Sequence, residues 1–122
     1  MPVLLWTALC DELQERGDTI LLKHVFCQVA AKSFPAKVKK FCVVSAFDGE
    51  LGEEFYYRVN FQTPVGKRYV RSSDHVRAVM GRVPEIASAD FEDFVFFEYG
   101  IYTVEIEVNG NPAHFVDLRI TK

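Results

Sequence analysis

Residues 55–62 have the sequence Phe55-Tyr56-Tyr57-Arg58-Val59-Asn60-Phe61-Gln62, in which every odd position is apolar and most even positions are polar. A period of two is typical of a β-strand with one face on a core and the other in water. Residues 101–108 repeat the alternation, and the turn-forming pair Asn109-Gly110 separates them from a third alternating run at 115–120. The segment 101–120 therefore predicts a β-hairpin.

The rest of the chain adds further predicted strands. Other apolar or alternating runs lie at 3–9, 19–29, 38–47, 67–72 and 86–97. The run 38–47 is apolar at both phases, which indicates a strand in the middle of a sheet. About seven strands with turn signals at this spacing predict an all-β fold, an antiparallel sandwich of two sheets that is immunoglobulin-like and spans residues 1–122 as one domain.

Residues 73–98 fit the strand pattern less well than their neighbours. Val76, Val79 and Met80 follow Asp74 at i, i+3, i+4 spacing, and Gly81 comes directly after them. Because Asp favours the first position of a helix and Gly its end, this pattern predicts a short helix over 74–80.

A second pattern narrows the type of sandwich. Residues 98–104 resemble the corner that leads into the sixth strand of immunoglobulin-like domains, where a Tyr hydroxyl bonds back to upstream backbone. Tyr102 matches that Tyr, and Val104 stands where the disulfide cysteine would be. Tyr102 is therefore expected to have a structural role; otherwise it is simply an inward-facing aromatic residue.

Over most of its length the chain also resembles a family of short bacterial proteins of unknown function. The resemblance rests on Leu9-Cys10-Asp11-Glu12, on Val25-Phe26 leading to Ser33-Phe34-Pro35, and on Gly100-Ile101-Tyr102 with Asn109-Gly110. Residues 73–92 depart from the family pattern, because they are longer and more charged. The resemblance implies a sandwich fold and no activity, cofactor or functional residue.

Composition and cysteine content limit the kind of partner and the cellular compartment that the chain can have. The formal charge of −3 disfavours nucleic acid as the main partner. Cys10, Cys27 and Cys42 each lie in an apolar run without a CxxC spacing, so we expect three buried, reduced thiols and a reducing compartment. The start of the chain lacks a basic segment before its short apolar run, and no run reaches membrane-spanning length. We therefore expect a cytoplasmic protein that does not enter membranes.

The sequence predicts no catalytic residues, no metal site and no cofactor. His24, His75 and His114 lack a ligand partner at zinc-site spacing, and His24 is expected to be a core or boundary residue. The acidic loop residues form no array of the kind that binds Ca²⁺. These acidic residues are Asp48, Glu50, Glu53, Glu54, Asp90 and Asp93.

The distribution of basic residues is the strongest functional signal. One basic segment comprises Lys67, Arg68, Arg71, Arg77 and Arg82. A second comprises Lys32, Lys37, Lys39 and Lys40. If the two segments meet in space, they form a patch for an acidic protein surface or for nucleic acid; if not, they are separate solvated faces.

These observations favour a non-catalytic protein-binding or assembly module. We expect a protein partner, with an acidic surface if residues 67–82 bind it, and an edge strand as a route to homo-oligomers. The alternative is a small enzyme or small-ligand binder with a site assembled across strands. A concave apolar cavity with converging polar groups would favour the alternative, and a flat surface the module.

Overall fold

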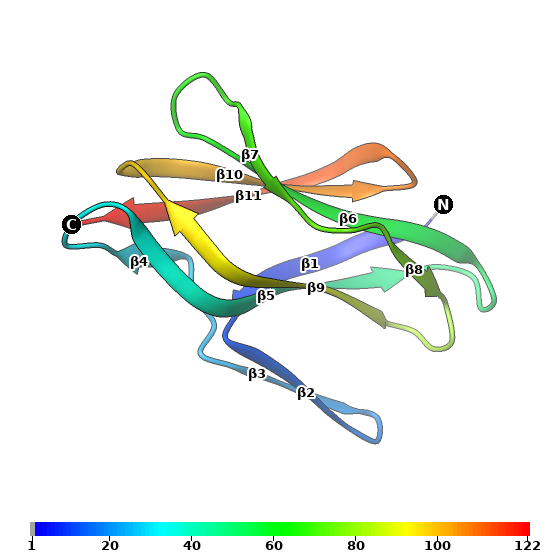
Figure 1. Cartoon of the computed structure of the whole chain (residues 1–122). Helices are drawn as coiled ribbons and strands as arrows, with labels where there is room; N and C mark the ends of the chain where they lie inside the picture. Colours follow the sequence, from blue (N-terminus) through cyan, green and yellow to red (C-terminus); the bar gives the residue numbers. More distant parts are fainter. Residues whose placement is uncertain (1) are drawn as a thin grey trace.

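A computed structural model describes residues 2–122, which form strands and no helix, and so contain no helical segment that could cross a membrane. The predicted all-β class is confirmed (Figure 1). The strands are β1 (Val3–Cys10), β2 (Glu12–Arg16), β3 (Thr19–Lys23), β4 (Gln28–Ala30), β5 (Ala36–Asp48), β6 (Glu54–Gln62), β7 (Tyr69–Ser72), β8 (Val76–Val79), β9 (Glu85–Phe96), β10 (Gly100–Val108) and β11 (Asn111–Thr121).

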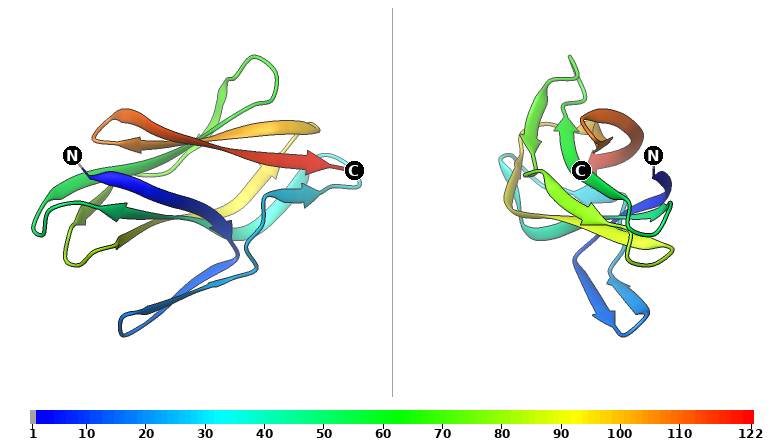
Figure 2. Two further views of the ribbon diagram at one scale, coloured as in Figure 1. Left: turned by 180° about the vertical axis from the view of Figure 1, so that it is seen from behind. Right: turned by 90° about the vertical axis from the view of Figure 1, so that its right-hand side faces the viewer.

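Two sheets form the sandwich. The three-stranded sheet has the order β1-β5-β9, and the six-stranded sheet has the order β4-β11-β10-β6-β7, with β8 also paired to β6. Strand β6 is long enough to pair with β7 near Asn60 and with β8 near Phe55. The β2–β3 hairpin forms a separate ribbon that projects from the side of the three-stranded sheet (Figure 2).

The core between the sheets is rich in aromatic rings. Phe41 of β5 and Phe91 of β9 stack with ring centroids 5.4 Å apart. Phe61 of β6 meets Phe91 edge to face at 5.0 Å and Phe94 at 4.7 Å. Because these rings come from both sheets, their contacts fix the separation and the relative position of the sheets.

Three hydroxyl groups form a hydrogen-bonded series within this core. The hydroxyl of fully buried Tyr57 lies 2.8 Å from Ser45 Oγ, which lies 2.8 Å from Thr7 Oγ1 on β1. Burial raises the pKa of Tyr57, so the phenol stays neutral. The pairing satisfies groups that would be costly to bury alone.

Strands β5 and β9 change their inward face at the same level. Val38 and then Phe41 face the core on β5, and Phe94 and Phe91 do so on β9. Asp93 adopts a φ of 52° at this point, and the pairing continues as Val38↔Phe94 and Phe41↔Phe91. The sheet therefore bends around the core without losing register, and β5 lies in the middle of its sheet as predicted.

The strand count exceeds the prediction of about seven. The run 19–29 is divided, because His24 turns the chain with a φ of 55° and leaves β4 only three residues long. Residues 12–16 form a strand that pairs with β3, and the polar sequence of this segment carries no strand signal. His24 is exposed and bonds Asp11 at 2.9 Å, so its predicted core or boundary position was wrong.

The predicted helix over 74–80 was also wrong. Residues Val76–Val79 form β8, in register with Tyr57 to Glu54 of β6. A helix of seven residues forms few hydrogen bonds against a costly nucleus, whereas β6 offers a free edge and Val76 and Val79 are β-branched. Long-range pairing therefore overrides the local helical spacing.

The structure gives the geometry of the predicted Asn109-Gly110 hairpin turn and of the predicted corner at Tyr102. Asn109 and Gly110 have φ angles of 53° and 80°, as a tight hairpin turn requires, and the predicted hairpin is confirmed. The hydroxyl of Tyr102 donates to the carbonyl oxygen of Glu98 at 3.4 Å. This bond links the start of β10 to the turn before it.

We predict that Tyr102→Phe lowers the free energy of unfolding by on the order of 1 kcal/mol, because the Glu98 carbonyl loses its donor. Urea unfolding of the variant and the parent measures the difference. Tyr56→Phe is the matched control, since the Tyr56 side chain is exposed and removal of its hydroxyl should change the free energy of unfolding little. Coincident unfolding curves for Tyr102→Phe and the parent would contradict the role given to this hydroxyl.

Candidate functional site

The structure distributes the five basic residues of the segment 67–82 over several places, and two of them form ion pairs. Arg77 on β8 binds Glu54 on β6 through two hydrogen bonds of 2.7 and 2.8 Å. Arg77 holds the pKa of Glu54 below its usual value. Arg82 lies 3.5 Å from Glu15 of the β2–β3 hairpin. Both arginines therefore face acidic groups of this chain.

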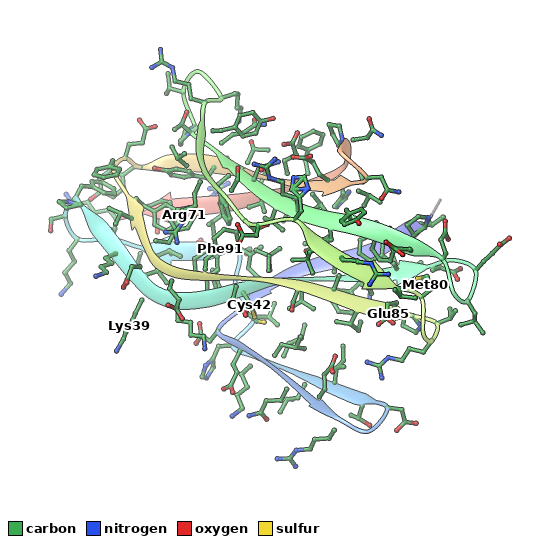
Figure 3. The ribbon with its side chains drawn as sticks, turned by 45° about the vertical axis from the view of Figure 1, so that its right-hand side comes forward. Lys39, Cys42, Arg71, Met80, Glu85 and Phe91 are labelled. Atoms are coloured by element: carbon green, nitrogen blue, oxygen red, sulfur yellow. The ribbon has the colours of Figure 1, made fainter. Side chains whose placement is uncertain are left out.

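Arg71 closes one open side of the sandwich. Its guanidinium donates to the backbone carbonyls of Glu92, at 2.8 Å, and of Asp93, at 3.3 Å, where β9 changes face. The same group lies 5.5 Å from the ring centre of Phe94 and 5.9 Å from that of Phe91 (Figure 3). Arg71 thus joins β7 of one sheet to β9 of the other, through contacts that a purely solvated charge lacks.

The two basic segments meet at this point. Lys37 of β5 forms an ion pair with the Asp93 carboxylate at 3.2 Å, next to the carbonyl that Arg71 binds. Lys39 and Lys40 are exposed on the adjoining part of β5. The contact between the segments therefore runs through an acidic residue that neutralises part of the charge.

Lys67 and Arg68 lie in an exposed turn at one end of the sandwich, close to the start of β10. Lys67 Nζ donates to Thr103 Oγ1 at 2.8 Å, and Pro64 of the same turn lies against Gly100. Gly100 has a φ of 128°, and a Cβ there would come within 2.9 Å of Pro64, so this position requires glycine.

Exposed apolar side chains flank the contact between Pro64 and Gly100. Val65 follows Pro64 in the turn, Phe97 lies in the short connection between β9 and Gly100, and their side chains are 77% and 70% exposed. We call Val65, Lys67, Arg68 and Phe97 the loop-end surface. It combines a basic character with an apolar one, which is typical of protein-binding surfaces.

A buried carboxylate lies on the outer face of the six-stranded sheet. Glu105 of β10 is 4% exposed and accepts hydrogen bonds from Asn60 Nδ2 at 2.9 Å and from the Tyr69 hydroxyl at 3.0 Å. Asn60 Nδ2 also contacts Glu107. Glu105 raises the pKa of Tyr69, because the phenol is held as a donor. Alternation alone predicts that Glu105 points into water, and it gives no sign that Tyr69 covers it.

A shallow polar depression of about 360 Å³ adjoins this network. Its lining residues are Arg58, Asn60, Tyr69, Ser72 and Glu107. The Nε atom of Arg58 is buried without a hydrogen-bond partner in the described part of the chain. The depression has converging polar groups and lacks the apolar enclosure that small-molecule sites usually have.

Strand β1 is an exposed edge of the three-stranded sheet and contains no charged residue. Val3, Leu5 and Trp6 are 61%, 51% and 37% exposed. A bulge between Leu4 and Trp6 interrupts the pairing with β5, which adds to the exposure of Leu5. The apolar run was visible in the sequence, but its position at an edge depends on the topology.

The backbone of β1 is also available along this edge. The Leu9 carbonyl accepts a hydrogen bond from Phe26 N at 2.9 Å, so Leu9 directs its backbone groups away from β5. Thr7, two positions earlier, directs its own N–H and C=O to the same side. Among residues 2–122 no backbone partner outside the β1–β5 ladder is found for Thr7.

A groove of about 200 Å³ follows this edge toward β11. Its lining residues are Thr7, Ala8, Leu9, Val25, Phe26, Cys27 and Val116. Cys27 is exposed there, so its predicted burial was wrong, whereas Cys10 and Cys42 are buried and all three are free thiols. Among the described residues no three His, Cys, Asp or Glu side chains are placed to hold a metal ion.

The fold and these surfaces define an all-β sandwich with shallow surface depressions and an apolar edge. Residues 5–121 match the model of a family of unknown function, DUF6941, and the chain belongs to that family. A search of curated proteins finds no match. Membership in a family of unknown function agrees with the prediction from sequence and assigns no site.

We predict that Arg71→Ser lowers the free energy of unfolding by roughly 1–2 kcal/mol, because two carbonyls lose their donor and two rings lose a cation. Arg68→Ser is the control, since Arg68 is exposed and surface substitutions usually change stability by less than about 0.5 kcal/mol. Urea unfolding of both variants measures the effect. Equal midpoints for the two variants would show that Arg71 does not close the sandwich.

Proposed function

We propose that the chain is a non-catalytic assembly module in which β1 pairs edge to edge with β1 of a second copy. The observation that carries this proposal is the uncharged edge of β1, with Val3, Leu5 and Trp6 exposed beside the unpaired backbone of Thr7. Natural proteins usually protect such edges with charge, proline, short length or a bulge, because an open edge recruits other strands. The bulge on β1 lies between Leu4 and Trp6, and the pairing with β5 is regular from Trp6 to Cys10, so the edge around Thr7 is not interrupted.

Four other strands with open edges in the described residues carry such protection. On β9, Arg71 occupies the carbonyls of Glu92 and Asp93. Strand β4 has three residues, and β8 contains Arg77. Strand β11 contains Pro112 and two charged residues, Asp117 and Arg119. The contrast supports β1 as the edge that a partner strand uses.

A second copy fits this edge better than a charged partner. Antiparallel pairing about a twofold axis places each β1 against the same neutral residues, so no like charges meet. The product is a continuous six-stranded sheet that contains both three-stranded sheets and covers Leu5 and Trp6 of each copy. Main-chain hydrogen bonds through Thr7 supply the pairing.

The loop-end surface supports a second binding site, for a protein with an acidic surface. Lys67 and Arg68 stand beside exposed Val65 and Phe97, so the site would combine charge attraction with apolar burial. If the whole basic segment 67–82 bound the partner, its other arginines would have to give up contacts within this chain. Arg77 would leave Glu54, and Arg82 would leave Glu15. Arg71 would leave the backbone carbonyls of β9.

The alternative of a small-ligand binder is supported by the polar depression at Arg58 and Glu107. Its openness to solvent favours the module, because ligand sites usually enclose most of the ligand. An immunoglobulin-like assignment is supported by the strand order, with β1-β5-β9 as strands A, B and E and β10 as strand F after the Tyr102 corner. The adjacent free thiols Cys10 and Cys42 support a cytoplasmic location.

We predict that the parent chain forms a dimer whose population rises with concentration, and that Leu5→Lys weakens it about tenfold or more, because a charge that the second copy would cover then replaces an exposed apolar side chain. Sedimentation velocity over a concentration series measures this. Leu21→Lys is the matched control, since Leu21 on β3 is also 51% exposed and lies away from β1.

Unfolding curves establish that each variant is folded, and Val3→Lys replaces Leu5→Lys if the latter unfolds. A parent that stays monomeric at every concentration would contradict the proposal. A dimer that Leu21→Lys weakens as much as Leu5→Lys does would also contradict it.

A further inference from the structure

Two buried thiols face each other across the three-stranded sheet. Cys10 of β1 and Cys42 of β5 are directly opposite in register, and their Sγ atoms lie 3.3 Å apart. Directly opposite residues of antiparallel strands have Cα atoms about 4.5–5.5 Å apart. A disulfide spans Cα separations of about 4.4–6.8 Å, so bond formation needs movement of the side chains and none of the strands.

The pair lies on the outer side of the sheet and is covered by the β2–β3 hairpin. Leu13 and Leu22 of the hairpin pack against the two cysteines. A polar surface depression of about 510 Å³ lies beside them, and Cys42 lines it whereas Cys10 does not. Figure 3 shows Cys42 on the side of β5 that faces the hairpin. Cys42 is 3% exposed and Cys10 is fully buried, so Cys42 is the more accessible of the two thiols.

We propose that Cys10 and Cys42 form a redox-active dithiol, which low-molecular-weight disulfides such as glutathione disulfide oxidise to an intramolecular disulfide. In the first step the Cys42 thiolate attacks one sulfur of the reagent, the reagent S–S bond breaks and one reagent thiol leaves. In the second step the Cys10 thiolate attacks Cys42 Sγ and displaces the second reagent thiol. The two cysteines lose two protons and two electrons, and the reagent takes them up as two thiols.

The surroundings of the pair make the reaction slow at neutral pH. Burial raises the pKa of Cys42 to about 12 and also raises that of Cys10. The charged groups that line the depression are Asp11, Glu12, Lys40 and Asp90. Because the thiolate is the reacting form and its fraction rises with pH, the rate should rise as pH is increased toward the pKa of Cys42.

The bond would have a defined structural effect. It closes a covalent loop from residue 10 to residue 42 that contains the β2–β3 hairpin, and it attaches β1 to β5 on the side away from the free edge. A cross-link of this kind stabilises the folded state relative to the unfolded chain. The free edge of β1 is unchanged, so the dithiol and the proposed assembly can be tested separately.

The test uses the full chain with Cys27→Ser, which removes the exposed thiol and leaves two cysteines. The folded protein is incubated with glutathione disulfide at several pH values and analysed by intact mass and thiol titration. We expect a product that has lost two hydrogen atoms, carries no glutathione and titrates no thiol. Tryptic digestion should join the peptides 1–16 and 41–58, and the urea midpoint should rise until a reductant reverses it.

Cys10→Ser in the same background is the control, and it should stop at the glutathione adduct on Cys42 or remain unreacted. The proposal is overturned if the folded two-cysteine protein keeps both thiols under conditions that oxidise its urea-unfolded form. A final product that retains glutathione on Cys42 would also overturn it, because Cys10 would then be unable to complete the exchange. Neither readout depends on dimerisation.

Discussion

Aromatic contact between the two sheets is the constraint on which the rest of the structure depends. Phe41 and Phe91 of the three-stranded sheet and Phe61 of the six-stranded sheet have ring centroids between 5.0 and 5.9 Å apart. To keep such rings inside along its whole length, β9 changes its inward face at Asp93 and β5 changes with it. The strand order puts β9 at one open side of the sandwich and β1 at the other, and the bend lies where Arg71 binds the β9 carbonyls.

The two open sides differ in chemistry. On one side Arg71 reaches from β7 to the carbonyls that the bend in β9 exposes, and its guanidinium also contacts two core rings. On the other side β1 presents neutral side chains and the backbone of Thr7 along a groove that leads to Val116. One side is therefore closed by the chain itself, while the other is an open apolar edge, which is the basis of the proposed pairing of β1.

Much of the fold could be predicted because its signals are local. Residues 55–62, 101–108 and 115–120 largely alternate, and Asn109-Gly110 specifies a tight turn, so β6, β10 and β11 follow from neighbouring residues. Strand β8 could not be predicted in this way, because its conformation depends on the free edge of β6. The same is true of β2, which is polar and acquires its structure by pairing with β3.

The candidate sites were harder to predict from the sequence than the fold, because they are formed by residues that lie far apart along the chain. The basic residues were visible in the sequence, but the partners of Arg77 and Arg82, Glu54 and Glu15, lie far from them along the chain. Glu105 alternates like a solvated residue and is buried because Tyr69 of another strand bonds it. The exposed apolar edge required knowledge of which strand lies outermost, which local periodicity does not contain.

The central claim is that β1 is the edge through which copies of the chain associate. Hydrogen–deuterium exchange of the Thr7 amide, followed by NMR at low and high protein concentration, tests it most directly. The account predicts that exchange of Thr7 slows as concentration rises, because its N–H becomes a donor to the second copy, while amides of the β2–β3 hairpin are unaffected. An exchange rate for Thr7 that is the same at every concentration would contradict the account.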